Sequence, residues 1–348
     1  MSPKNPAMII LEAGVNHNGD INQALRLVEE AAKSGADYIK FQTYTASRLA
    51  ARNSPSYWNL EEEPITSQRE LFSKFDGFSK SDYFQIANHA NKMGIGFMTT
   101  CFDEIWVDEL DSLISIYKIA SADITNYPLL KHIARKQKPI LLSTGASTFS
   151  EIESALETIA EFNNTEVCLM HCVLNYPTES ENASLMRINH LQDHFPNHTI
   201  GYSDHTRPSF SKQALLIAYS LGASVFEKHF TMDKNRKGND HYHSFDTQDT
   251  IDLIANLKLI RDALHFSEEN YVTIQKDARQ YARRGLYAKT NMQKGDLIEE
   301  INVEALRPTH KPNGIEANAI SRILGKRLVA DLSAGEPITE IHFSNETH

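Results

Sequence analysis

Two lysines lie inside apolar segments of this sequence, where a positive charge needs a reason. Lys40 and Gln42 alternate with Ile39 and Phe41, so in an extended strand the polar pair and the apolar pair point to opposite faces. Lys118 interrupts a second apolar run. Because a buried ammonium group is costly without an anion, the two lysines indicate a carboxylate or phosphate ligand.

A Ser-Thr-Gly turn at residues 143–145 precedes a predicted helix and can add backbone N–H groups to such an anion site. The alternative is that both lysines only balance the charge of glutamates within the protein.

Two histidines and several carboxylates also lie at the ends of apolar segments. His205 and His229 end two successive segments, beside Asp204 and Glu227, and Glu12 ends the first segment of the chain. A single such histidine is usually structural. Imidazole nitrogens are common ligands of divalent cations, and two at equivalent strand ends favour a metal site.

The cysteines suggest no further chemistry. Cys172 follows a histidine in sequence, but no activating motif surrounds it, so a buried structural thiol is favoured over a nucleophile. Cys101, Cys168 and Cys172 are too few for a disulfide framework and indicate a reducing compartment, with the cytoplasm as the expected location.

The elements that must position these residues follow a regular alternation of short apolar runs and amphipathic stretches. Eight strand–helix units in about 250 residues predict an α/β fold, a closed (β/α)8 TIM barrel, in which the carboxyl ends of all strands converge on one rim. The absence of a GxGxxG motif after the first run disfavours a dinucleotide-binding sheet. The predicted strands are Met8–Ala13, Tyr38–Gln42, Gly96–Thr100, Ile116–Ile119, Pro139–Ser143, Val167–His171, Thr199–Ser203 and Val225–His229.

The stretches between these runs read as helices. Thr148 and Glu151 have the spacing of a capping box at a helix start. One connection, residues 43–79, is far longer than an ordinary βα loop and indicates either a functional excursion or a packed structural insertion. The predicted helices include Asn22–Lys33, Lys80–Lys92, Ser150–Phe162, Ser211–Leu221 and Thr247–Leu264.

Length and composition set the outer limits. The 348 residues are 41% hydrophobic and 23% charged, which is ordinary for a globular protein and disfavours disorder. The net charge of -10 argues against a nucleic-acid or anionic membrane partner, so an anionic substrate needs local positive charge. No apolar run approaches the roughly 20 residues of a membrane span.

The last part of the chain has a different character. We predict a barrel domain over residues 1–270, a linker over 271–280 and a small, mostly β domain over 281–348. Within it, Asn291–Ile298 (NMQKGDLI) resembles Asp331–Ile338 (DLSAGEPI), each with a glycine followed by an acidic residue.

A set of ordered strings spanning nearly the whole chain resembles the sialic acid synthase family, which carries a C-terminal antifreeze-like (SAF) domain. The strings are ILEAGVNHNGD (Ile10–Asp20), IKFQTY (Ile39–Tyr44), YKIASADITNYPLL (Tyr117–Leu130), LLSTGAS (Leu141–Ser147), GYSDHT (Gly201–Thr206), EKHFT (Glu227–Thr231), KGNDHYHS (Lys237–Ser244) and RRGLYA (Arg283–Ala288).

The resemblance implies an N-acetylneuraminate or related nonulosonic acid synthase, which condenses phosphoenolpyruvate with an N-acyl amino sugar to a nine-carbon 2-keto acid. It implies Glu12 as the catalytic carboxylate, and His205 and His229 as ligands of a divalent metal, Mn²⁺. Positions matching the family's phosphoenolpyruvate site are Lys40, Gln42, Lys118, Ser121, Ser143 and Ser203. Positions matching its amino-sugar site are Thr100, Phe102, Asp123, Tyr176, Asp240 and Arg307.

Arg307 matches an arginine that enters the partner subunit's barrel, which implies a domain-swapped homodimer. Three departures from the family pattern lie on the sugar side: Asp123 in place of a glutamate, Leu174 where an asparagine is frequent, and Gly-Asn-Asp at residues 238–240 in place of Gly-Pro-Asp. They bear on the identity of the sugar, which we expect to be N-acetylmannosamine or a 2,4-diacetamido-trideoxyhexose.

Two other functions compete with this reading. A metal-dependent aldolase would cleave the keto acid to pyruvate and needs no phosphate site, so Lys40, Lys118 and the Ser-Thr-Gly turn disfavour it. A carbohydrate-binding protein with an inactive barrel is disfavoured by Glu12, His205 and His229.

Overall fold

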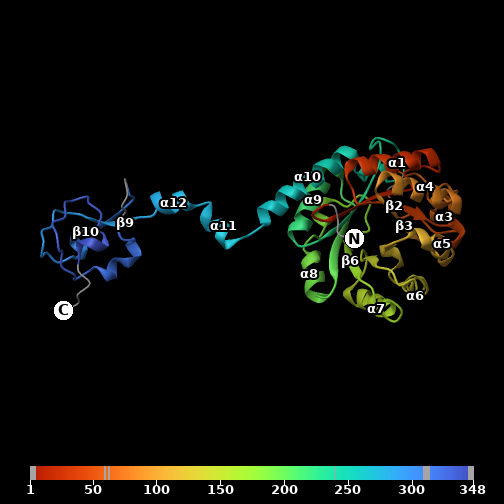
Figure 1. The fold of residues 1–348 in the computed structure, drawn as a ribbon. Helices are drawn as coiled ribbons and strands as arrows, with labels where there is room; N and C mark the ends of the chain where they lie inside the picture. The colour runs from red at the N-terminus through yellow and green to blue at the C-terminus, as the bar shows by residue number, and fades with distance from the viewer. Residues whose placement is uncertain (1–4, 59, 62, 239, 309–313, 344–348) are drawn as a thin grey trace. The chain divides into compact units, whose positions relative to one another are not determined.

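The computed structural model describes residues 5–58, 60–61, 63–238, 240–308 and 314–343 (Figure 1). The chain divides into two compact units, Met1–Leu264 and His265–His348, and each is described by itself. In both units the described helices are too short or too polar to cross a membrane.

The first unit is an eight-stranded parallel barrel, as predicted. Its strands lie in the order β3-β2-β1-β8-β7-β6-β5-β4, and β3 packs against β4 to bring the two ends of the sheet together. Figure 1 shows the helices placed around this sheet. The strands are β1 (Met8–Gly14), β2 (Tyr38–Thr43), β3 (Gly96–Cys101), β4 (Tyr117–Ile119), β5 (Ile140–Ser143), β6 (Val167–Cys172), β7 (Thr199–Asp204) and β8 (Val225–His229).

The helices begin and end where local chemistry requires it. Asp20 accepts a hydrogen bond from Asn22 N to cap α1, which ends at Gly35 in the left-handed region (φ 86°). The predicted capping box of Thr148 and Glu151 is present at the start of α7. The helices of the barrel are α1 (Ile21–Ser34), α4 (Lys80–Met93), α5 (Glu104–Leu110), α6 (Tyr127–Ala134), α7 (Phe149–Ala160), α8 (Arg187–His194), α9 (Pro208–Ser220) and α10 (Thr247–Leu264), with 3₁₀ helices η1 (Asp111–Leu113), η2 (Ser121–Asp123), η3 (Ser180–Asn182) and η4 (His241–His243).

The alternation along each strand separates two cores. Ile39 and Phe41 belong to the large core between strands and helices. Ile10, Met98 and Met170 lie in a smaller core inside the barrel. Because successive side chains of a strand point to opposite faces, the interior positions further along the strands receive the polar residues.

The long excursion after β2 is a folded segment with its own short helices, α2 (Ala46–Leu49) and α3 (Gln68–Ser73). The ring of Tyr44 packs against Phe72 at 5.3 Å between centroids, and Asp76 Oδ2 accepts a hydrogen bond from Ala46 N at 2.8 Å. These contacts support a packed insertion, and they leave Tyr57 62% exposed.

The second unit contains a small antiparallel sheet of β9 (Gly285–Ala288) and β10 (Val303–Leu306). Its own core includes Leu286, Ile298 and Ile338. Short helices lie before, between and after the two strands: α11 (Glu268–Thr273) and α12 (Lys276–Tyr281) before β9, η5 (Glu300–Asn302) between β9 and β10, and η6 (Ala317–Arg322) and η7 (Glu340–His342) after β10.

The repeated sequence in this unit forms two matching turns that bond to each other. Met292 and Leu332 exchange backbone hydrogen bonds in both directions. Asn291 and Asp331 each accept a hydrogen bond from a backbone N–H of the opposite turn, at 2.8 Å. The internal sequence similarity therefore corresponds to a local structural repeat.

Candidate active site

The polar residues at the strand ends converge inside the mouth of the barrel. Lys40 and Lys118 form one buried cluster with two glutamates. Lys40 Nζ lies 2.6 Å from Glu12 Oε1 and 3.7 Å from Glu227 Oε2, and Lys118 Nζ lies 3.2 Å from Glu227 Oε1. The charge-balancing Lys–Glu pairing is therefore the arrangement that this structure holds.

Three predicted residues complete this cluster with hydrogen bonds. Gln42 Nε2 donates to Glu12 Oε1 at 2.9 Å, and Lys40 Nζ donates to Thr100 Oγ1 at 3.2 Å. Ser203 Oγ donates to Glu227 Oε1 at 2.9 Å. Strands β1, β2, β3, β4, β7 and β8 thus contribute to one connected group, and the structure shows which of their side chains pair.

The cluster keeps its members charged. Burial alone would raise the pKa of Glu12, but the positive charge of Lys40 and the nearby His229 hold that pKa well below its usual value. Burial alone would lower the pKa of Lys40, yet the carboxylates of Glu12 and Glu227 raise it. Glu12 is therefore a carboxylate and Lys40 an ammonium group near neutral pH.

Some polar atoms of the mouth are buried without a hydrogen bond. Among the residues that the structure describes, Ser143 Oγ and Glu227 Oε2 have no hydrogen-bond partner. Unsatisfied buried atoms cost free energy, and they mark places where a ligand or ordered water can bind.

The Ser-Thr-Gly turn is closely packed beside this mouth. Gly145 N donates to Ser121 Oγ at 2.9 Å, and Thr144 N donates to Met170 O at 3.0 Å. A Cβ atom at Gly145 would lie 2.9 Å from Ser121 Oγ and 3.3 Å from Cys172 O, so glycine is required by close approach. These two backbone N–H groups are already used and would have to change partners to bind an anion.

The two predicted histidine ligands lie side by side, 5.4 Å apart between ring centroids. His205 Nδ1 donates to Val173 O at 2.9 Å, which leaves its Nε2 for a ligand. His229 lies between two carboxylates, with Nε2 3.7 Å from Glu12 Oε2 and Nδ1 3.3 Å from Asp240 Oδ2.

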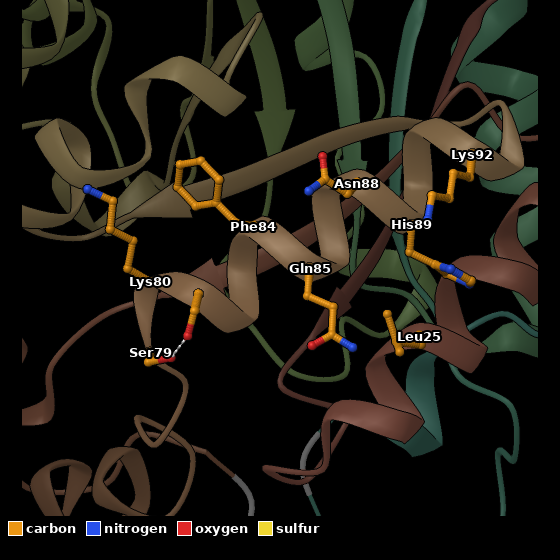
Figure 2. A pocket seen from close by; sticks show the side chains of 9 residues that line it. Leu25, Ser79, Lys80, Phe84, Gln85, Asn88, His89 and Lys92 are labelled. Carbon is orange, nitrogen blue, oxygen red and sulfur yellow. Dashed lines mark hydrogen bonds between the residues drawn. The ribbon is translucent and has the colours of Figure 1, made fainter.

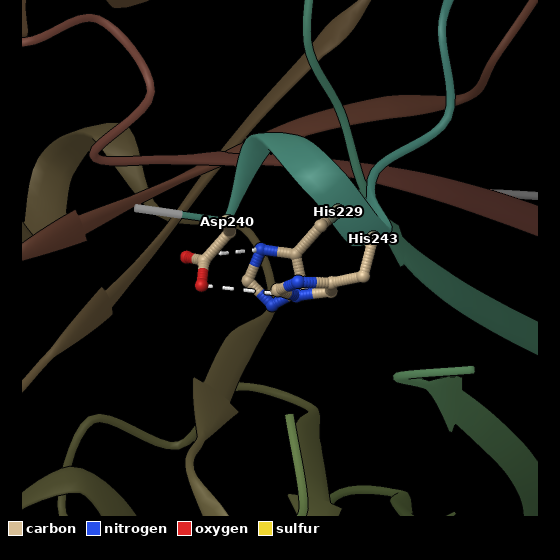
Figure 3. Close-up of side chains that lie close together, drawn as sticks. All are labelled: His229, Asp240 and His243. Atoms are coloured by element: carbon tan, nitrogen blue, oxygen red, sulfur yellow. Dashed lines mark ion pairs between the residues drawn. The ribbon is translucent and has the colours of Figure 1, made fainter. Parts of the chain in front are cut away.

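A third histidine, which the sequence analysis did not select, joins this group. One donor atom from each of His229, Asp240 and His243 lies within 4.8 Å of the other two (Figure 3). The nitrogen and carboxylate donors suit a divalent transition metal. The repeated histidines of Lys237–Ser244 were the available signal, but the 3₁₀ helix η4 is what turns His243 inward.

Cys172 contacts His205, and nothing in the sequence pattern indicates this contact. Its Sγ lies 3.6 Å from His205 Nδ1. Burial alone would lower the pKa of His205, but the neighbouring sulfur raises it to about 9. A metal ligand must be a neutral imidazole, so cation binding at His205 would release a proton.

The predicted sugar-site residues divide between the mouth and other parts of the molecule. The Tyr176 ring lies 4.3 Å from the His205 ring, and Phe102 packs against Tyr44 at 5.9 Å. Asp123, on η2, accepts a hydrogen bond from Asn126 at 3.2 Å, and burial raises its pKa. Arg307 is exposed in the second unit, and Asn239 of the Gly-Asn-Asp departure lies outside the described residues.

Asp204 directly precedes His205 in sequence but does not take part in this site. It is at an outward-facing position of β7 and forms an ion pair with Lys228 of β8, with 2.7 Å between Oδ2 and Nζ. Strand alternation explains the difference, because Ser203 faces the interior and its neighbour therefore cannot.

A surface hollow on the outer side of the barrel is separate from these residues. Lys80, Phe84, Gln85, Asn88 and others of α4 line it together with Leu25 of α1 (Figure 2). It contains none of the predicted site residues.

Two family models match successive parts of this chain. Residues 27–269 match the NeuB family, and residues 283–343 match the SAF domain. The N,N'-diacetyllegionaminic acid synthase of Campylobacter jejuni is 37% identical, covering 96% of this chain and 99% of the relative. The enzyme of the same name from Legionella pneumophila is 35% identical, covering 98% and 97%.

A similar solved structure is also named as a sialic acid synthetase. The N-acetylneuraminic acid synthetase of Leptospira borgpetersenii, crystallised with citrate, has 31% identity and a TM-score of 0.68, covering 79% of this chain and 93% of that one. With a family match over more than half of its length, this chain belongs to the NeuB family and carries a SAF domain at its C-terminal side.

Proposed function

We propose that this protein is a nonulosonic acid synthase, which condenses phosphoenolpyruvate with an N-acyl amino sugar and releases phosphate. The observation that carries the proposal is the buried group of two lysines, two glutamates and two histidines at the barrel mouth. Similar enzymes from Campylobacter and Legionella are named for N,N'-diacetyllegionaminic acid, which supports a 2,4-diacetamido sugar as the first substrate to test.

The charges of the mouth fit an anionic substrate only if a cation joins it. Lys40 and Lys118 are balanced by Glu12 and Glu227, so binding a polyanion leaves excess negative charge. His205 and His229 would hold a divalent cation, for which we propose Mn²⁺. When bound, such a cation supplies a Lewis acid that polarises the aldehyde oxygen of the open-chain sugar.

In the proposed reaction, C3 of phosphoenolpyruvate bonds to the aldehyde carbon of the sugar and leaves an oxocarbenium centre at C2. Lys40, Lys118, Ser143 and Ser203 hold the phosphate and carboxylate groups, which contributes by positioning and by charge stabilisation. The ionised Glu12 directs water to C2, and the proton that this water loses neutralises the alkoxide formed from the aldehyde oxygen. The tetrahedral intermediate then expels phosphate by C–O cleavage, which yields the 2-keto acid.

The test is phosphate release with a panel of amino sugars, with products identified by mass. Release should require phosphoenolpyruvate, a sugar and a divalent metal, stop with a chelator and return with Mn²⁺. Pyruvate formation from the keto acid without phosphate chemistry would instead support the aldolase. No release with any amino sugar tested would contradict the proposal.

We also propose that the active unit is a domain-swapped homodimer in which Arg307 enters the partner's barrel and contacts the N-acyl group. Its exposed position after β10 leaves it accessible to a partner. Arg307→Ala should raise the KM for the sugar while the dimer, measured by light scattering, remains. Unchanged sugar kinetics would count against this role.

The remaining proposals concern organisation and location. We propose a barrel domain over residues 1–270, a linker over 271–280 and the SAF domain over 281–348. The family match ending at residue 269 and the SAF match beginning at 283 support these limits. The three cysteines are buried and unpaired, which supports a reducing location such as the cytoplasm.

A further inference from the structure

His243 is a buried polar side chain that none of the steps above uses. It is fully buried, and neither ring nitrogen has a hydrogen-bond partner within the described parts of the chain. Burying an imidazole without hydrogen bonds costs free energy, because both nitrogens lose the water that they would bind outside. The hydrogen-bonding capacity of this ring is therefore left for a ligand.

The ring lies directly against the cation site. Its Nε2 atom is 3.7 Å from Asp240 Oδ1, and its centroid is 4.8 Å from that of His229. Figure 3 shows the Asp240 carboxylate facing both rings. Helix η4 produces this geometry, because Asp240 and His243 are three residues apart and therefore lie on one side of the turn.

We propose that His243 supplies a further nitrogen ligand to the divalent cation held by His229, with Asp240 as the neighbouring carboxylate. The inference rests on the proposed function for the presence of a cation, and it adds a residue to the pair His205 and His229. One donor atom from each of His229, Asp240 and His243 can be chosen so that the three lie within 4.8 Å of one another. Modest side-chain rotation around a central ion brings such donors to bonding distance.

This ligand changes which metals bind tightly. Each added imidazole favours metals late in the Irving–Williams order, so zinc and cobalt gain more affinity than manganese. The site should therefore bind Zn²⁺ and Co²⁺ more tightly than Mn²⁺ in the absence of substrates.

The competing explanation is that His243 is a packing residue. Its ring lies 4.7 Å from Tyr242 and 5.7 Å from Tyr176, so aromatic contacts also hold it. His243→Phe separates the two explanations, because phenylalanine retains a packed ring and removes both nitrogens. His241→Gln is the matched control on the same helix, since the His241 ring is bonded to Thr231 Oγ1 at 2.7 Å and is outside the donor group.

The experiment measures metal binding by the untagged full chain without substrates. Calorimetry gives the affinity for Zn²⁺, Co²⁺ and Mn²⁺, and the visible absorption of bound Co²⁺ reports the ligands. His243→Phe should weaken Zn²⁺ binding by about 100-fold or more, which exceeds the roughly 10- to 100-fold loss typical of removing a residue that only hydrogen-bonds to a metal ligand. The variant should also change the Co²⁺ spectrum. His241→Gln should change neither.

Thermal unfolding checks that each metal-free variant is folded. Should His243→Phe unfold, His243→Leu and His243→Gln provide the same comparison at different volumes. A Zn²⁺ affinity within about twofold of the wild type, with an unchanged Co²⁺ spectrum, would overturn the inference, as would a wild-type chain that binds none of the three metals. Metal binding through His243 in a protein that releases no phosphate would leave the inference standing and contradict the synthase.

Discussion

Two buried lysine clusters include adjacent residues of β8, Glu227 in the inward cluster and Lys228 in the outer pair, and their hydrogen-bonding groups are satisfied to different degrees. Lys228 faces outward, where its ammonium group donates to Asp204 Oδ2 at 2.7 Å and Thr206 O at 2.6 Å. Asp204 Oδ1 also accepts from Tyr202 Oη at 2.7 Å. Every strong hydrogen-bonding direction of this outer pair is used, so it has no room for a ligand.

The inward cluster of Lys40 and Lys118 is incomplete by comparison. Glu227 Oε2 and Ser143 Oγ have no hydrogen bond to any described residue. Lys118 has one carboxylate oxygen at 3.2 Å, whereas the outer Lys228 has closer partners. Buried charge alone therefore does not distinguish a binding site from a structural pair. What separates these two clusters is the hydrogen-bonding capacity that remains unfilled in the inward one.

The largest expected effect is on the outer pair. Lys228→Met leaves Asp204 buried without its counterion, which should lower the free energy of unfolding by about 3–5 kcal/mol. Urea denaturation measures this change. A loss below about 1 kcal/mol would mean that the pair is far less important than its geometry suggests, and Lys212→Met on the surface provides a control expected to lose less than about 1 kcal/mol.

The inward cluster should respond in substrate binding more than in stability. Lys118→Met removes a charge-assisted contact to the proposed phosphoenolpyruvate, so its KM should rise about 10- to 100-fold. Lys118→Arg should recover part of this loss. Initial-rate kinetics at saturating sugar measure the change, and a KM within twofold of the wild type would remove Lys118 from the anion site.

The pH dependence of stability sharpens the contrast for Lys228→Met. In the wild type, burial alone would raise the pKa of Asp204, but Lys228 lowers it below its value in the unfolded chain. The ion pair therefore contributes to the free energy of unfolding above about pH 4, and this contribution is lost as pH falls through the pKa of Asp204 in the folded protein. In Lys228→Met burial is opposed only by the neutral hydrogen-bond donors that remain, such as Tyr202, so the pKa of Asp204 should rise above its wild-type folded value and Asp204 should take up a proton on folding at a higher pH.

The stability difference between the two proteins should therefore shrink as pH falls from 7 to 4. Urea denaturation at several pH values across this range measures it. A difference that stays constant would show that the lysine stabilises by packing rather than by charge.

The smallest effect concerns one hydrogen bond of the inward cluster. Thr100→Val keeps the shape of the side chain but removes the hydroxyl oxygen that accepts from Lys40 Nζ. The less well-held lysine should weaken phosphoenolpyruvate binding by about 1 kcal/mol. The KM for phosphoenolpyruvate should change by less than about tenfold, with unfolding in urea close to the wild type. A change as large as that of Lys118→Met would assign Thr100 direct contact with the substrate.

The barrel, and the convergence of the strand-end polar residues at its mouth, were predictable because strand periodicity is a local property. The alternation of Lys40 and Gln42 with Ile39 and Phe41 correctly separates the interior from the helix-facing core. The same rule, applied to β7, would have turned Asp204 away from His205 and towards Lys228. Adjacency to His205 in sequence therefore does not place Asp204 in the site.

His243 and the contact between Cys172 and His205 were beyond such rules. The position of His243 depends on where the connection after β8 returns to the mouth, and the contact of Cys172 with His205 depends on the register of the neighbouring strands β6 and β7. No local sequence pattern specifies either. The unpartnered nitrogens of His243 became visible only once the surrounding side chains were in place.

The order of apolar and polar residues by itself determined the eight-stranded barrel, the end of the barrel at which the candidate site lies, and the separate C-terminal unit. It could do so because periodicity and turn residues act over short distances. Only the tertiary structure decided which charges pair, which buried atoms remain unsatisfied and which histidines face one another. Those features depend on distances between segments up to more than 200 residues apart, such as Glu12 and His229, which the fold alone brings together.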